Sequence, residues 1–151
     1  METYRIVLKK WSKKLVASGN AARWNSGGRE VIYTAASRAL ATLENMVHRS
    51  GEGSNELYKV MVITIPSVVK HDVVSLADLP DLWWEVTRYH ECRAVGDRWL
   101  TLGKSAVLKI PSAIIMHEYN YLLNPAHPDF KKIKLLRTEA FKFDPRIKTG
   151  S

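Results

Sequence analysis

Short runs of apolar residues, broken by polar turns, recur along most of the chain and predict a sheet with few helices. These runs are rich in β-branched and aromatic residues, as strands are. Strands are expected over residues 4–9, 31–34, 57–65, 106–110, 114–121 and 132–143. Because the strands are not regularly interleaved with long helices, the pattern predicts a mixed, largely antiparallel sheet in an α+β domain.

One segment, residues 37–48, changes to the period of a helix. Its apolar residues recur at helical spacing, namely Ala36, Leu40, Leu43 and Val47. Ser37 or Thr34 is the expected N-cap, and Gly51 stands where a C-terminal cap would fall. Glu44 borders this apolar face instead of lying opposite it.

Two further helices are expected, over residues 80–86 and over part of 89–102. In the first, Trp83 and Trp84 are the expected core anchors. In the second, Gly96 lowers the helix propensity. These helices would flank the sheet.

The length and composition are those of one soluble domain. The chain has 151 residues, of which 46% are hydrophobic and 25% charged. No stretch approaches the roughly 18 consecutive apolar residues of a membrane span, and the N-terminus has no signal-peptide core, so a cytoplasmic location is expected. Cys92 is the only cysteine, which excludes an intrachain disulfide, and it is expected to be a small, half-buried apolar residue.

A net charge of +8 favours anionic partners. Nucleic acid, a phosphorylated small molecule and an acidic protein all remain open, since no long basic run occurs. The five histidines lack zinc-site spacing, and no metal is expected. The chain also lacks a Walker A loop and a Gly-x-Gly-x-x-Gly sequence, so any NAD⁺ would not bind as in a Rossmann fold.

Four polar residues stand against apolar structure and are candidates for chemistry. Arg23 lies on a Gly- and Ser-rich loop suited to phosphate. Tyr33 ends a short strand and could stack on a planar ligand. Glu44 could stabilise an oxocarbenium-like ribose, and Ser112 follows a strand-ending proline. Taken singly, each also fits a structural role: a solvated arginine, a core tyrosine, a glutamate paired with His48, or a turn serine.

Taken in order, these segments resemble the RES domain, a family named after an Arg, a Glu and a Ser. The resemblance rests on blocks spread over nearly the whole chain, namely Tyr4-Arg5-Ile6, Arg23-Trp24-Asn25-Ser26, Val31-Ile32-Tyr33-Thr34-Ala35, Leu43-Glu44, Val47-His48, Gly96-Asp97, Trp99-Leu100, Val107-Leu108, Ile110-Pro111-Ser112-Ala113, Asn120, Leu122-Leu123-Asn124-Pro125, His127-Pro128-Asp129-Phe130 and Phe143-Asp144-Pro145-Arg146.

The resemblance implies a domain over residues 1–148, with 149–151 as a flexible tail or remnant of a fusion. It implies a split mixed sheet with flanking helices, like that of diphtheria-toxin-type ADP-ribosyltransferases. It also implies the toxin of a bacterial type II toxin–antitoxin pair, held by an Xre-type helix-turn-helix antitoxin. On this hypothesis the toxin causes growth arrest by cleaving the nicotinamide–ribose bond of NAD⁺, its substrate, through hydrolysis or phosphorolysis.

The resemblance also implies roles for individual residues. Arg23 would hold a phosphate or ribose of NAD⁺, Tyr33 would pack on the nicotinamide side, Glu44 would stabilise the ribosyl cation, and Ser112 would hydrogen-bond nicotinamide or ribose. The implied catalytic set is Arg23, Glu44 and Ser112, and the implied substrate-binding set adds Trp24, Asn25 and Tyr33.

One departure and two alternatives remain. The family has glycines where this chain has Ala21-Ala22; if those positions need positive φ, each alanine costs roughly 1 kcal/mol. The first alternative function is mono-ADP-ribosylation of a cellular protein by the same residues. The second is a basic, non-enzymatic nucleic-acid binder, which no nucleic-acid motif supports; contact with DNA is expected only through the antitoxin.

Overall fold

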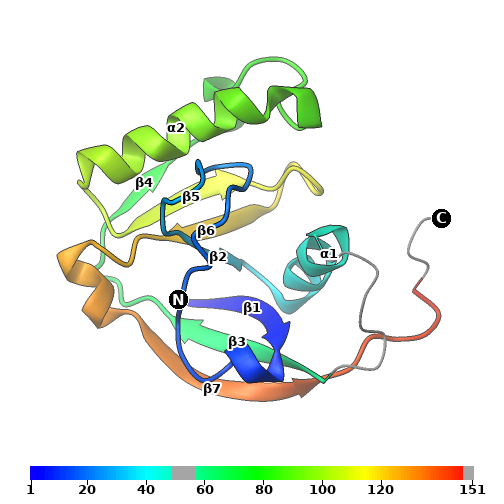
Figure 1. Ribbon diagram of the computed structural model, residues 1–151. Coiled ribbons are helices and arrows are strands. Elements are labelled where there is room, and N and C mark those ends of the chain that lie inside the picture. The colour runs from blue at the N-terminus through cyan, green and yellow to red at the C-terminus, as the bar shows by residue number, and fades with distance from the viewer. Residues whose placement is uncertain (49–56, 148–151) are drawn as a thin grey trace.

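The computed structural model describes residues 1–48 and 57–147, and these residues form one seven-stranded mixed sheet (Figure 1). The strands are β1 (Glu2–Leu8), β2 (Ile32–Ala35), β3 (Tyr58–Thr64), β4 (His71–Val73), β5 (Val107–Pro111), β6 (Tyr119–Leu123) and β7 (Lys134–Phe141). Their order across the sheet is β4-β5-β6-β2-β1-β3-β7. Only β4 and β5 pair in parallel among these strands. The expected mixed, largely antiparallel sheet is therefore confirmed.

The sheet is nearly divided between its two central strands, β2 and β1. These strands pair at a single position, Tyr4 opposite Ala35, whereas β1 pairs with β3 along its whole length. The sheet thus consists of a β4-β5-β6-β2 half and a β1-β3-β7 half that meet at one point.

Both α-helices of the described residues, α1 (Arg38–His48) and α2 (Tyr89–Leu102), pack on the same face of this sheet. The core under α1 comprises Ile6, Ala35, Leu40, Ala41, Tyr58, Val60 and Val62. The core under α2 comprises Trp24, Val31, Val74, Trp83, Cys92, Trp99, Leu108, Ile110 and Leu122. Figure 1 shows α2 over the β4-β5-β6 end and α1 on the far side of β2. Helix α1 contacts both β1 and β2, the strands on either side of the split.

The opposite face carries a third core group that runs across both halves. Because side chains alternate along a strand, Met61 and Ile63 of β3 turn away from α1, and Val107 and Leu123 turn away from α2; all four belong to this group. No helix in the described parts of the chain has the length and apolar composition needed to cross a membrane.

Helix α1 agrees with its sequence pattern in extent but not in its buried face. The Ser37 hydroxyl accepts the Leu40 N–H at 3.0 Å, as an N-cap does; the expected cap at Gly51 lies outside the described residues. Leu40 and Ala41 are buried, whereas Leu43 and Val47 are exposed. The buried face is therefore rotated toward Glu44, which lies four residues after Leu40 and on the same side.

Two other expectations about the chain were wrong. Residues 80–86 do not form a helix: Leu82 has φ of 59°, which a right-handed helix cannot contain, and Trp84 is 38% exposed while Trp83 is buried. Residues 114–118 form a turn before β6 instead of extending it. By contrast, α2 continues through Gly96 despite its low helix propensity. A Cβ there would lie 1.7 Å from the Trp24 carbonyl oxygen, so this close approach requires glycine.

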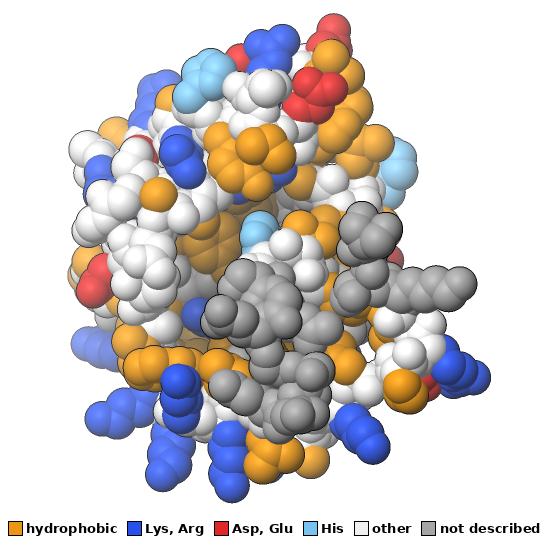
Figure 2. All heavy atoms as spheres, turned by 45° about the vertical axis from the view of Figure 1, so that its right-hand side comes forward, with side chains coloured by type: hydrophobic (Ala, Val, Ile, Leu, Met, Phe, Trp, Pro, Cys, Tyr) orange, Lys and Arg blue, Asp and Glu red, His pale blue; other side chains and the backbone are white. Residues whose placement is uncertain are grey.

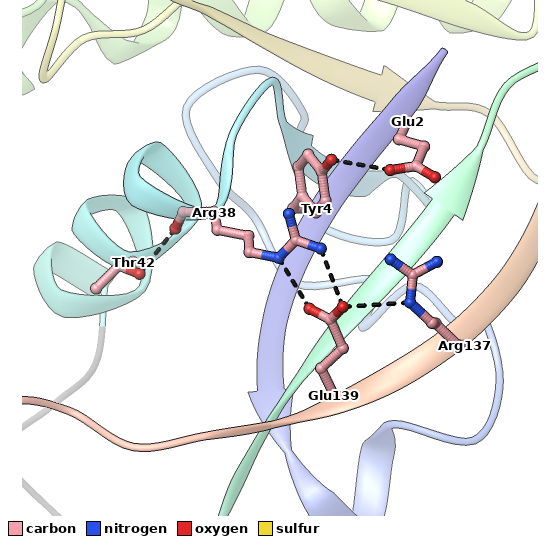
Figure 3. A network of polar contacts seen from close by, with 6 residues as sticks. All are labelled: Glu2, Tyr4, Arg38, Thr42, Arg137 and Glu139. Atoms are coloured by element: carbon pink, nitrogen blue, oxygen red, sulfur yellow. Dashed lines mark hydrogen bonds and ion pairs between the residues drawn. The ribbon is translucent and has the colours of Figure 1, made fainter.

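The first turn of α1 is tied to the far edge of the sheet by a polar network (Figure 3). The Arg38 guanidinium donates to both carboxylate oxygens of Glu139 on β7, at 2.8 and 3.0 Å. It also lies over the Tyr4 ring, 4.5 Å from the centroid. The Arg137 side chain donates to the same carboxylate at 3.2 Å. The network thus attaches α1 to the β1-β3-β7 half.

Candidate active site

A cleft of about 510 Å³ opens at the split in the sheet, beside α1. Figure 2 shows the surface hollowed near the middle of the view. Its polar and charged lining comes from β1, the loop before β2, β2 itself, α1 and β6, namely Tyr4, Arg5, Ser18, Asn20, Arg23, Tyr33, Thr34, Glu44, Asn45, His48 and Asn120. The cleft therefore collects side chains from both halves of the sheet.

Glu44 of α1 is held on the cleft wall by three donors. Its Oε1 accepts the Ser112 hydroxyl at 2.9 Å and the Asn120 amide at 2.6 Å. The His48 Nε2, one turn further along α1, lies 3.5 Å from Oε2. The side chain remains 23% exposed, so the carboxylate is fixed but still reaches the cleft.

The surroundings of Glu44 favour its charged form. Burial alone raises the pKa of the carboxyl, but the hydrogen bonds from His48, Asn120 and Ser112 together outweigh it, and the net pKa lies below the ordinary value. Glu44 is therefore ionised at neutral pH and places a fixed negative charge in the cleft.

Ser112 lies behind Glu44, fully buried just after β5, and is not part of the cleft lining. Its Oγ donates to Glu44 and accepts the backbone N–H groups of Ile114 and Ile115, at 3.0 and 3.1 Å. A hydroxyl has one donor and two acceptor sites, and all three are used. In this arrangement Ser112 orients Glu44.

Arg23 lies on the cleft wall and contacts the segment before α2 that contains Trp83 and Trp84. Its guanidinium donates to the carbonyl oxygens of Trp83 and Trp84, at 3.1 and 2.8 Å, and lies 4.2 Å from the Tyr89 ring centroid. Since a guanidinium carries five N–H donors, donors remain after these two bonds. Arg23 can therefore hold an anion without losing its anchor.

Tyr33 joins the loop that carries Arg23 (residues 18–30, called the arginine loop) to the sheet. Its hydroxyl donates to Asn25 Oδ1 at 2.6 Å and accepts the Trp24 N–H at 3.2 Å. Burial raises the pKa of the Tyr33 phenol. The ring and Trp24 line the cleft, whereas Asn25 is buried, outside the lining, and donates to three backbone carbonyls of its own loop. Asn25 thus shapes the loop from within.

The arginine loop is fastened to α2. Asp97 accepts both the backbone N–H and the hydroxyl of Ser26, and Arg93 donates to the Ala22 carbonyl at 2.7 Å. Among the described non-glycine residues only Leu82 has positive φ. The alanines at 21 and 22 therefore carry no cost from a left-handed backbone, contrary to the concern raised by their sequence.

Arg5 also lines the cleft, although the sequence alone predicted no role for it in the site. Burial lowers the pKa of its guanidinium. Within the described residues no carboxylate forms an ion pair with it, and its one hydrogen bond, to the Val16 carbonyl, is 3.5 Å long. The available signal was a charged residue between Tyr4 and the apolar run Ile6-Val7-Leu8 of the first strand. The side chain is half-buried and its guanidinium has donors to spare, so Arg5 is suited to an anionic ligand.

Cys92 lies outside the cleft lining and is fully buried in α2. Burial raises the pKa of its thiol, which keeps it protonated. The expected apolar environment of Cys92 is confirmed, although the residue is fully buried and not half-buried as the sequence suggested. In the part of the chain that the structure describes, no group of three or more His, Cys, Asp or Glu side chains could hold a metal ion.

Comparisons with known proteins identify relatives of this chain. The family model of the RES domain matches residues 3–144. The chain is 35% identical over 127 residues to a Prs ADP-ribosylating toxin of Sphingobium sp. (strain YBL2), covering 83% of this chain and 79% of the relative. It is 30% identical to a Toxin Res of Yersinia enterocolitica over an alignment of 155 positions, which covers 98% of this chain and 100% of the relative.

The fold is also similar to that of a solved structure. A chain in the crystal structure of the M. tuberculosis MbcT–MbcA toxin–antitoxin complex superposes with a TM-score of 0.74 over 93% of this chain and 84% of that chain, at 16% identity. At this identity the likeness concerns the fold.

Proposed function

The chain belongs to the RES domain family, and on that premise we propose that it is the toxin of a bacterial type II toxin–antitoxin pair and cleaves the nicotinamide–ribose bond of NAD⁺. The relatives named as toxins support the first part of the proposal. The charges of the cleft support the second.

The observation that carries the proposal is the ionised Glu44, fixed in a cleft that also contains two arginines. Breaking the nicotinamide–ribose bond sends its electron pair to nicotinamide and leaves positive charge on the ribose carbon. A carboxylate held ready for that charge stabilises it without reorganising first. Hydrogen bonds from Ser112 and Asn120 provide this preparation.

The remaining lining fits the rest of NAD⁺. Arg23 has guanidinium donors to spare, and Arg5 has no carboxylate partner among the described residues, so the two can bind the pyrophosphate. The Tyr33 ring, with its hydroxyl already bonded, offers an apolar surface to the nicotinamide. NAD⁺ is thus a substrate in this proposal, and no cofactor or metal takes part.

Two acceptors complete the reaction in the main proposal. Water attacking the ribose carbon yields ADP-ribose, nicotinamide and a proton, and inorganic phosphate yields the 1″-phosphate of ADP-ribose with nicotinamide. A second candidate is transfer to a protein side chain, and the name of the Sphingobium relative, an ADP-ribosylating toxin, favours it. All three use the same Glu44.

A toxin must be blocked in its own cell, and we propose that an Xre-type antitoxin covers the cleft. The similar chain in a toxin–antitoxin complex supports such a partner. Co-expression with its Xre-type antitoxin should restore growth and abolish NAD⁺ cleavage by the purified pair. An antitoxin that restores growth while leaving cleavage intact would contradict this part of the proposal.

The function is tested by incubating the purified protein with NAD⁺, with and without phosphate, and separating nicotinamide from the ribosyl products. Free ADP-ribose indicates water as acceptor, and the 1″-phosphate indicates phosphate. In a parallel lysate reaction, label from the adenylate of NAD⁺ that stays on a protein band indicates transfer to protein. Folded protein that releases no nicotinamide in any of these reactions would refute the proposal.

A further inference from the structure

Two buried amide oxygens on the cleft wall have no hydrogen-bond partner among the described residues. They are Oδ1 of Asn120 on β6 and Oδ1 of Asn45 on α1, and both residues line the cleft beside Glu44. Asn120 is only 8% exposed. Buried carbonyl oxygens are nearly always paired, because leaving one unpaired is costly.

The orientation of both amides is set by their N–H groups. Asn120 donates to Glu44 Oε1 at 2.6 Å, and Asn45 donates to the Ile6 carbonyl at 3.1 Å. Rotating either amide by half a turn would bring two oxygens together at these distances. The free atom is therefore an oxygen in each case, and it can only accept.

The other polar side chains that contact Glu44 are Ser112 and His48. Ser112 has used its donor and both acceptor sites, so it offers nothing to a ligand. The His48 ring already faces Glu44 Oε2 with its Nε2, at 3.5 Å, so the unpaired acceptors beside the carboxylate are the two amide oxygens. A ligand that satisfies this group must bring hydrogen-bond donors.

We propose that Asn45 and Asn120 accept hydrogen bonds from the 2′- and 3′-hydroxyls of the ribose that carries nicotinamide. The inference rests on the proposed function, which places the carbon next to these hydroxyls at Glu44. Both oxygens are closed to solvent in this structure. The two side chains therefore rotate slightly as the ribose enters, and the recognition of the sugar includes a small induced fit.

The assignment makes Asn120 a substrate-binding residue as well as a donor to Glu44. Neighbouring polar groups then have different roles. Ser112 orients the carboxylate from behind, and the two asparagines read the sugar hydroxyls from the cleft wall. The Asn45 amide donates to the Ile6 carbonyl and not to Glu44, so its loss reports on sugar recognition without a direct effect on the carboxylate.

The test measures the Kd of carba-NAD⁺ by calorimetry. In this analogue a methylene replaces the ring oxygen of the nicotinamide-side ribose, which prevents cleavage and keeps the hydroxyls. A second analogue lacks both hydroxyls on that ring. The variants are Asn45→Ala and Asn120→Ala. Thr3→Val is the matched control, because Thr3 Oγ1 is also buried without a partner but lies outside the cleft lining.

Each asparagine variant should weaken carba-NAD⁺ binding roughly tenfold, the usual size for one lost hydrogen bond in a buried site. Thr3→Val should leave the Kd unchanged. The parent should bind the dideoxy analogue at least tenfold more weakly than carba-NAD⁺. With the dideoxy analogue, the Kd of each asparagine variant should equal that of the parent, because the hydroxyls that the asparagines would contact are missing.

Equal losses for both analogues would mean that the asparagines only support the wall, and would overturn the inference. A parent that binds both analogues equally well would overturn it too, without depending on the folding of any variant. Nicotinamide release from NAD⁺, followed in parallel, tests the proposed function separately. A folded parent that binds no carba-NAD⁺ would overturn the inference and the proposed binding of NAD⁺ together.

Discussion

Ser112 donates its hydroxyl proton to Glu44 over 2.9 Å, and the same oxygen accepts two backbone N–H groups. The serine therefore acts on a substrate through the carboxylate that it holds. The pair joins the end of β5 to α1, so the turn after β5 and the helix must both be in place before the charge is positioned.

The first expected outcome concerns the acid side of the pH profile. Because the pKa of Glu44 lies below its ordinary value, nicotinamide release should stay level as pH falls to the usual carboxyl range and decline only below it. Ser112→Ala removes one hydrogen bond that lowers this pKa, so the acid limb should move to higher pH and kcat should fall about tenfold.

Ser67→Ala, at an exposed serine outside the cleft lining, is the control and should leave the profile unchanged. An acid limb that does not move in Ser112→Ala would show that Ser112 has no influence on the charge of Glu44.

Arg5 should be required for binding substrate. Arg5→Gln removes a positive charge from the cleft and should raise KM for NAD⁺ by roughly 10- to 100-fold, the range for a lost charge-assisted hydrogen bond. Arg98→Gln removes an equal charge from an exposed position of α2 outside the cleft lining and should leave KM nearly unchanged. Similar changes in both variants would indicate a general effect of net charge.

The contact between α2 and the arginine loop should tolerate no side chain at Gly96. A Cβ there would lie 1.7 Å from the Trp24 carbonyl oxygen, so Gly96→Ala must push the loop from α2 and should destabilise the fold by about 2 kcal/mol or more. Gly27→Ala is the matched control in the same loop, since its Cβ would meet nothing closer than 3.9 Å. Urea unfolding of both variants checks this, and equal stabilities would contradict so close an approach of α2 to the loop.

The ion pair between Arg38 and Glu139 should contribute little to stability despite its two short hydrogen bonds. Both side chains are partly exposed, 44% and 32%, so a double-mutant cycle with alanine should give only a small coupling. The coupling should shrink further at high salt. A large coupling that salt does not change would mean that the pair is far better shielded from solvent than these exposures indicate.

The strands of the sheet could mostly be predicted from the sequence, because their apolar runs are a local property. The strand β4 could not, since His71, Asp72 and Val73 are all exposed and owe their extended shape to pairing with β5. The helix expected over 80–86 failed for a similar reason. Its tryptophans suggested a packed helix, but Arg23 holds two of its carbonyls and Leu82 takes positive φ.

The candidate site could be predicted in part. Arg23, Tyr33 and Glu44 line one cleft, as the resemblance to the RES family led us to expect, while Ser112 and Asn25 lie behind its wall. Arg5 and Asn45 were not singled out. Their position depends on the split between β1 and β2 and on the rotation of α1, neither of which leaves a mark in local sequence.

The most direct measurement compares nicotinamide release from NAD⁺ by the parent and by Glu44→Gln, with Tm and circular dichroism recorded for both. The glutamine keeps the size of the side chain and removes its charge. We expect release by the parent and a loss of at least roughly a hundredfold in a variant that remains folded. Equal release by a folded Glu44→Gln would contradict the central claim that the charge of this carboxylate drives the cleavage.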